Sequence, residues 1–93
     1  MVSRKRRRVV QTARFEQELE AVLKEHPRAE ESFRGFEEVV SRQPTIGMSV
    51  RDQPTNVCGL PIHTEGASFL VLYRYDERRV VCLALRRVPS GQF

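Results

Sequence analysis

Residues 69–87 constrain the fold of this chain more than any other stretch. Two apolar runs flank the polar tetrad Asp76-Glu77-Arg78-Arg79, and the second run ends at an arginine pair. Runs of β-branched, aromatic and leucyl residues around a short polar turn predict a β-hairpin. Apolar residues occupy both alternating faces of each run, so we expect both faces of these strands to be largely covered, as in a sheet packed against helices. Basic side chains then lie at or beside the rim of a small core.

Two helices are predicted before the hairpin. Thr12 is a favourable N-cap for a helix with one apolar stripe, which ends before Pro27. A second helix is expected over residues 29–42, and Pro44 prevents its continuation. The linker around Pro27 is too short for anything but an antiparallel helical hairpin.

The apolar pattern changes period after the second helix. Residues 46–50 form either a short strand or a loop, and residues 57–63 predict a strand in which Pro61 favours an edge or bulged position. Residues 9–10 can add a short strand. The expected fold is α+β: a short N-terminal strand, and an antiparallel helical hairpin packed on one face of a three- to four-stranded antiparallel sheet whose other face is partly open.

The length of 93 residues is that of one domain with a modest core. We expect a single domain over residues 1–93, with a basic tail at 1–8 and a second tail at 89–93 that are candidates for disorder.

Charge is unevenly distributed along the chain. Residues 1–14 hold six basic groups and no acids, residues 15–38 have a net charge of −5, and residues 39–93 have a net charge of +3. A basic surface favours nucleic acid or an acidic protein as partner over an acidic substrate. The acidic helices would repel nucleic acid, so a polyanion is expected to approach from the sheet side.

Composition also bears on compartment and cofactors. No apolar run approaches the length of about 20 residues that a membrane span requires, and the basic opening is not followed by a signal-peptide core. We therefore expect a cytoplasmic protein with no membrane partner. Cys58 and Cys82 fall within predicted strands without metal-ligand spacing, so buried reduced thiols, no metal and no small-molecule cofactor are expected.

The order of these patterns resembles the RelE/ParE superfamily of bacterial toxins. The resemblance rests on residues 9–19 (VVQTARFEQEL), on Gln43-Pro44-Thr-Ile-Gly47 after the second helix, on the strand FLVLY at 69–73, and on VVCLAL at 80–85 after an acidic turn. It implies a toxin of a type II toxin–antitoxin system, neutralised by a cognate antitoxin that wraps it with a helix or an extended segment. RelE-like members cut messenger RNA in the ribosome, whereas ParE-like members act on DNA gyrase without being nucleases.

The chain departs from the RNA-cleaving members at two places. They carry an arginine just after the aromatic that opens the strand at 69–73, where this chain has Leu70, and a leucine cannot stabilise a phosphate. Many of them also place a basic, tyrosine-bearing segment after the last strand, whereas this chain ends in Ser-Gly-Gln-Phe. Whether the chain is an enzyme therefore stays open, a metal-independent endoribonuclease with a degenerate active site being one hypothesis.

Candidate site residues follow from position and chemistry. Cleavage of RNA by this fold would need a base, a cation beside the phosphate and an acid. The candidates for catalysis are Arg86, Arg87, His63 and Tyr73. Because consecutive strand residues point to opposite faces, only one of the two arginines can face the open side of the sheet.

The candidates for RNA or partner binding are Arg74, Arg51, Arg4, Lys5 and Arg6. For His63 and Arg74 an ordinary solvent-exposed role is the alternative. Two hypotheses of function remain: a toxin that inhibits translation by mRNA cleavage or acts on gyrase, and a degenerate, non-catalytic module that binds RNA or an acidic protein through its basic sheet face. An unrelated α+β domain with this pattern is a third, weaker alternative.

Overall fold

The computed structural model describes residues 6–64 and 66–89. Within them the order of elements is β1 (Arg8–Gln11), α1 (Ala13–Glu25), α2 (Ala29–Arg42), a 3₁₀ turn η1 (Pro44–Ile46), β2 (Met48–Ser49), β3 (Cys58–Thr64), β4 (Ala67–Tyr75) and β5 (Arg79–Val88). The predicted tail residues 1–5 and 90–93 lie outside the described residues.

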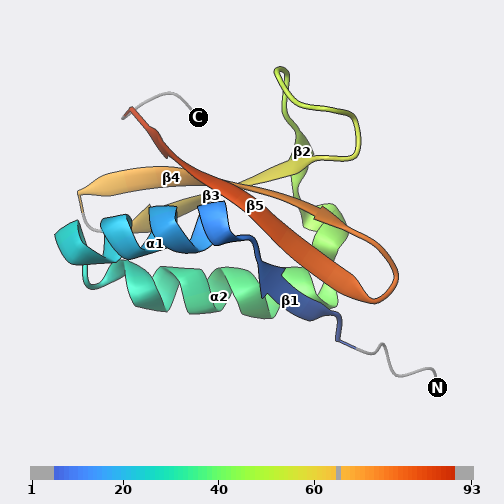
Figure 1. Ribbon diagram of the computed structural model, residues 1–93, viewed down its shortest axis with the longest axis horizontal. Helices are drawn as coiled ribbons and strands as arrows, with labels where there is room; N and C mark the ends of the chain where they lie inside the picture. The colour runs from blue at the N-terminus through green and yellow to red at the C-terminus, as the bar shows by residue number, and fades with distance from the viewer. Residues whose placement is uncertain (1–5, 65, 90–93) are drawn as a thin grey trace.

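The two helices have the predicted boundaries. Thr12 caps α1, because its Oγ1 accepts a hydrogen bond of 3.1 Å from the N–H of Phe15. At the other end the N–H of His26 bonds to the carbonyl of Val22, and Pro27 follows. The two helices lie antiparallel on the same side of the sheet (Figure 1), which confirms the predicted helical hairpin.

The sheet has five strands in the order β1-β5-β4-β3-β2. Strands β2 to β5 are antiparallel to their neighbours, whereas β1 pairs with β5 in parallel. The sheet is thus mixed, and larger by the N-terminal strand than the expected antiparallel meander. The parallel pairing continues one residue beyond β1, because the N–H of Thr12 bonds to Cys82 O. The sequence held no signal for this pairing, which joins residues about 70 positions apart.

The main core lies between the helices and the sheet. Its buried residues come from α1, α2 and alternate positions of the strands: Phe15, Ala29, Phe33, Phe36, Val40, Ile62, Phe69, Val71, Tyr73, Val80, Cys82 and Leu85. Phe36 and Tyr73 meet edge to face, with ring centroids 5.8 Å apart. A register shift at Leu72/Tyr73 gives β5 one extra residue, Leu83.

A second, smaller core covers part of the opposite face. It consists of Val57, Leu72 and Ala84, with Val50, Leu70 and Leu83 packed around it. The segment between β2 and β3 rises on the side of the sheet away from the helices (Figure 1) and brings Val50 over the strands. Gly59 permits this approach, since a Cβ there would lie 2.6 Å from Val50 Cγ2.

Candidate functional site

Arg86 and Arg87, near the end of β5, point to opposite faces of the sheet. Arg86 lies on the face away from the helices, where its guanidinium contacts both carboxylate oxygens of Asp52, at 3.3 Å and 3.1 Å. Arg87 lies on the helix side, 3.8 Å from a carboxylate oxygen of Glu25 at the end of α1. The predicted division of the pair between the two faces is therefore present, and each guanidinium has an acidic partner.

The contact with Arg86 changes the acidity of Asp52. Hydrogen bonding to the guanidinium is the main reason that the pKa of this carboxyl is below its ordinary value. Asp52 belongs to the segment that carries Val50 and Val57, so the ion pair ties that segment to β5. Arg86 therefore has a fixed carboxylate partner, which would compete with a phosphate for its guanidinium.

Tyr73 is completely buried in β4. Its hydroxyl donates a hydrogen bond of 2.6 Å to Pro44 O and accepts one of 3.0 Å from the N–H of Gly47. Burial raises the pKa of Tyr73 to about 12. A phenol with both hydrogen bonds used inside the core has a structural role, and this placement does not suit the catalytic role expected from the sequence.

His63 lies exposed near the end of β3, on the face away from the helices. Its Nδ1 is 2.9 Å from Ser68 Oγ across the β3–β4 pair, and its carbonyl accepts a hydrogen bond from Ser32 on α2. In the strand register His63 faces Ser68, two residues before Leu70, which faces Arg86. The backbones of the histidine and the arginine are thus separated by about 10 Å across the strands and by about 7 Å along them, so the two side chains are not register neighbours.

The predicted binding arginines are dispersed. Arg74 is exposed near the end of β4, and Arg51 is exposed in the segment that follows β2. Arg6 forms a 2.8 Å ion pair with Glu38 on α2. Arg4 and Lys5 lie outside the described residues. On the open face, Arg74 and Arg86 are separated by the apolar pair of Leu72 and Ala84.

Comparison with known proteins identifies the fold. No protein-family model matches the sequence, and no curated protein does. Among solved structures, a chain from the structure described as "Chromosomal ParDE TA system from P. aeruginosa" superposes with a TM-score of 0.68 at 14% identity, over 89% of this chain and 97% of that chain. The fold is RelE/ParE-like. This likeness confirms the fold class that the sequence resemblance implied, and at this identity it concerns the fold alone.

The RelE/ParE-like fold of this chain does not gather the predicted catalytic side chains into one cluster. Tyr73 is in the core, Arg87 faces the helices, and Arg86 and His63 share a face at a distance. Leu70 is directly opposite Arg86 in the strand register, so the position at which the sequence resemblance would require a cation for RNA cleavage is apolar. The arrangement provides charged surface for binding more readily than it provides paired acid and base groups.

Two further features of the described residues bear on function. No helix among them is long and apolar enough to cross a membrane. No group of three or more His, Cys, Asp or Glu side chains in the same residues could hold a metal ion.

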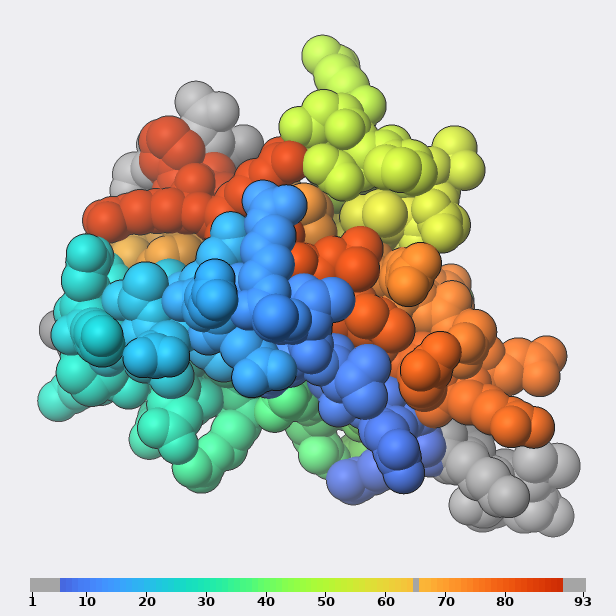
Figure 2. Space-filling view, viewed as in Figure 1, coloured from blue at the N-terminus to red at the C-terminus, as the bar shows by residue number. Residues whose placement is uncertain are grey.

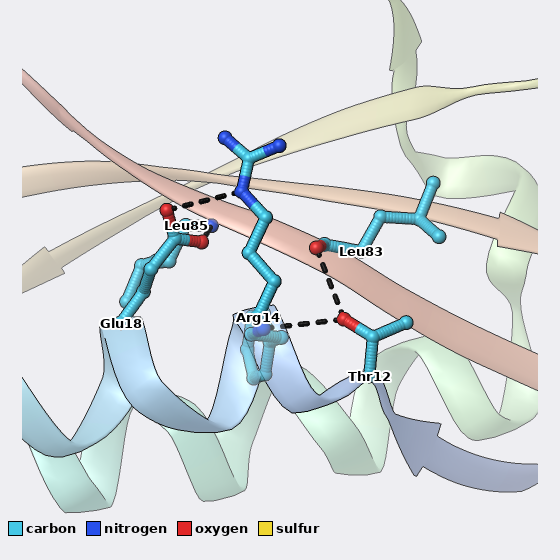
Figure 3. Close-up of polar contacts among 6 residues, drawn as sticks. Thr12, Arg14, Glu18, Leu83 and Leu85 are labelled. Atoms are coloured by element: carbon cyan, nitrogen blue, oxygen red, sulfur yellow. Dashed lines mark hydrogen bonds and ion pairs between the residues drawn. The ribbon is translucent and has the colours of Figure 1, made fainter.

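The outer edge of β5 contains functional groups that the sequence did not single out. β1 pairs only with Arg79–Cys82, so β5 continues to Val88 beyond its neighbour. Thr12 Oγ1 donates to Leu83 O at 3.1 Å, and Glu18 Oε1 accepts from the N–H of Leu85 at 2.9 Å (Figure 3). Glu18 had looked like one more solvated glutamate of α1, because nothing local indicates a partner 67 residues away.

The hydrogen-bond pattern of β5 predicts which backbone N–H and C=O groups on its outer edge are open to a partner. In an antiparallel strand the groups of alternate residues point to the same side, so the N–H and C=O of Arg87 face outward like the N–H of Leu85. Beyond the contacts of Thr12 and Glu18, this edge can accept a short extended segment.

Proposed function

We propose that this chain is the toxin of a toxin–antitoxin pair and that it acts by binding its target rather than by cleaving RNA. The observation that carries the proposal is the likeness in fold to a chain of a chromosomal ParDE system. Of the two targets that the resemblance implies, DNA gyrase fits this chain better than ribosome-bound messenger RNA.

The positions of three side chains support action by binding instead of RNA cleavage. Arg86 is held by Asp52, Leu70 occupies the neighbouring position on β4, and the phenol of Tyr73 is buried with both of its hydrogen bonds used. Metal-independent RNA cleavage needs a base, a cation and an acid around one phosphate. The remaining candidate, His63, pairs with Ser68 in the strand register, whereas Arg86 pairs with Leu70.

A cognate antitoxin is the proposed regulatory partner. The outer edge of β5 offers backbone groups to an extended segment. Arg87 lies beside this edge, and an acidic side chain of the segment would replace or share its 3.8 Å contact with Glu25. Addition of a strand at this edge would extend the sheet without disturbing its core.

The decisive experiment is induced expression of the full chain in a bacterial host. We expect growth arrest that is relieved by co-expression of a neighbouring reading frame of antitoxin size. The purified chain is then expected to inhibit gyrase supercoiling and to leave messenger RNA intact in a ribosome-dependent cleavage assay. Cleavage of messenger RNA with no effect on gyrase would reject the binding mode.

Two variants separate the mechanisms in the same assay. Arg86→Ala/Arg87→Ala and His63→Gln are expected to retain growth arrest, because no cleavage step depends on them. In a nuclease, loss of the arginine pair would abolish arrest, and loss of a general base would slow cleavage by at least about 100-fold. Either result, together with a normal unfolding transition of the variant, contradicts the proposal.

The second candidate function is a non-catalytic module that binds RNA or an acidic protein through its basic sheet face. The exposed arginines of β4 and β5 favour it. Failure of the induced chain to arrest growth, with or without the neighbouring reading frame, would select this alternative.

A further inference from the structure

Five arginines gather at the end of the sheet opposite to Arg86 and Arg87. They are Arg7 and Arg8 at the start of β1, Arg74 near the end of β4, Arg78 in the turn, and Arg79 at the start of β5. The start of β1 and the β4–β5 turn lie beside each other at this end (Figure 2), because Arg8 is the register partner of Arg79 and its N–H bonds to Arg78 O at 2.9 Å. We call these five residues the arginine end.

The arginine end differs from the rest of the surface in its lack of ion pairs. Within the described residues none of the five forms one, whereas most other arginines do. Ion pairs join Arg6 and Arg42 to Glu38, Arg14 to Glu18, Arg34 to Glu30, Arg86 to Asp52 and Arg87 to Glu25. Positive charge is therefore in excess at one end of the sheet.

The nearby carboxylates do not cancel this charge. Asp76 Oδ1 accepts hydrogen bonds from the backbone N–H groups of Arg78 and Arg79 at 2.7 Å and 2.8 Å, which lower the pKa of this carboxyl and shape the turn. Glu77 is exposed. Two carboxylates thus stand against five guanidinium groups.

The arginines point to both sides of the β4–β5 hairpin. Arg7 lies on the helix side, where its Nε donates to Asp76 O at 2.7 Å and its guanidinium is 5.8 Å from the centre of the Tyr75 ring. Arg8, Arg74 and Arg79 lie on the opposite face by strand alternation. Arg78 occupies the turn between the two sides.

Two shallow hollows accompany these side chains. Among the described residues, those that line one hollow, of about 520 Å³, are Arg8, Asp76, Arg78 and Arg79. The other, of about 320 Å³, is lined by Arg74, Arg79, Asn56, Tyr75, Asp76 and Val81. The described residues that line the first hollow are all charged, and arginine guanidinium groups match the geometry of phosphate oxygens.

We propose that the arginine end is a docking site for the phosphate backbone of double-stranded DNA. Guanidinium groups on both sides of a projecting turn can contact both phosphate strands that border a groove. The major groove of B-form DNA is about 12 Å wide and admits a β-ribbon, whereas the major groove of duplex RNA is too narrow for side chains to enter. The site is independent of the toxin role and reads no base sequence, because its contacts are to phosphates.

The test is binding of the full chain to a fluorescein-labelled DNA duplex of about 20 base pairs, measured by fluorescence anisotropy across a range of NaCl concentrations. The variant Arg8→Gln/Arg74→Gln/Arg79→Gln is expected to weaken binding at least about tenfold and to reduce the slope of log K against log salt by about one to three. The corresponding lysine variant keeps the charges and is expected to stay within about threefold of the parent chain.

The matched control removes the same charge from the helices. Arg14, Lys24 and Arg34 have side chains that are 69%, 77% and 74% exposed, so Arg14→Gln/Lys24→Gln/Arg34→Gln changes net charge equally without touching the arginine end. Its affinity for DNA is expected to change by less than about twofold, since phosphate contacts are local to the docking site.

Three outcomes would overturn the proposal. Equal losses in the two glutamine variants would mean that net charge alone attracts DNA. Equal affinity for duplex RNA would show that the site does not depend on the wide major groove of B-form DNA. Tighter binding of polyglutamate than of DNA, lost in the arginine-end variant, would assign the surface to an acidic protein. Thermal unfolding of each variant shows whether the fold is intact.

Discussion

Tyr73 in β4 donates a 2.6 Å hydrogen bond to the carbonyl oxygen of Pro44, the first residue of the 3₁₀ turn after α2. The same hydroxyl accepts a bond from the N–H of Gly47. One phenol therefore connects the middle of the sheet to the segment that leads from the helices into β2. The sequence suggested this tyrosine as a catalytic group, but in the structure it fixes the segment after α2 to the sheet.

Replacement of Tyr73 tests this role. Tyr73→Phe keeps the ring but leaves Pro44 O and the N–H of Gly47 without their partner, so we expect the free energy of unfolding to fall by about 1–3 kcal/mol. Urea denaturation measures the change. The control Tyr75→Phe, at a ring that is 37% exposed, is expected to change stability by less than about 0.5 kcal/mol. A Tyr73→Phe chain of unchanged stability would refute the structural role.

Stability is expected to fall in alkaline solution. Burial raises the pKa of Tyr73 from 10.0 to about 12 and that of Cys82 from 9.0 to about 12. Both groups are neutral when protonated, so the folded state binds more protons than the unfolded state over this range. Their stabilising contribution is complete below about pH 9 and is lost as the pH rises towards 12, by roughly 1.4 kcal/mol per pH unit for each group.

Urea denaturation between neutral pH and pH 12 measures this loss. In Tyr73→Phe the decline above pH 10 is expected to be shallower, because the phenol is gone and only the thiols of Cys82 and Cys58, whose pKa values burial also raises, still contribute. A parallel decline in the two proteins would show that Tyr73 is not responsible.

Two glycines are expected to respond in opposite ways to alanine. At Gly35, in the interior of α2, an added Cβ meets no atom within 4 Å, so Gly35→Ala is expected to stabilise the protein by about 0.5–1 kcal/mol. At Gly47 the added Cβ would collide with the hydroxyl of Tyr73, so Gly47→Ala is expected to destabilise it. Melting temperatures of the two variants provide the comparison, and a stabilised Gly47→Ala would contradict the tight packing there.

The cap of α1 gives a fourth prediction. Thr12→Ala removes the acceptor for the N–H of Phe15 and the donor to Leu83 O, so a loss of about 1–2 kcal/mol is expected in urea denaturation. Thr12→Ser keeps the hydroxyl and is expected to retain most of this stability. Equal losses in the two variants would assign the effect to the methyl group of Thr12 instead of its hydrogen bonds.

Most of the helices and strands could be predicted because they depend on interactions between residues close in the sequence. The boundaries of the helices follow from Thr12, Pro27 and Pro44, because capping and the missing N–H of proline act within a few residues. The β4–β5 hairpin follows from two apolar runs around a polar turn, and the RelE/ParE-like fold follows from the order of these elements.

The site depends on contacts between residues far apart in the chain. The partner of Arg86 is Asp52, 34 residues away, and Glu18 bonds to Leu85, 67 residues away. A sequence shows which residues are charged but not which of them form ion pairs. For this reason the sequence pointed to Arg86 and Arg87 as site residues, although each has a carboxylate beside it in the structure.

The sequence by itself determined the helical hairpin, the β-hairpin, the α+β class and the excess of basic groups on the strands, because these depend on periodicity and turn chemistry within short windows. Only the tertiary structure decided that β1 pairs in parallel with β5 and so brings Arg8 beside Arg79. Strand register and the pairing of charges are set by packing across the whole chain, and for that reason the unpaired arginines emerge only once the sheet is assembled.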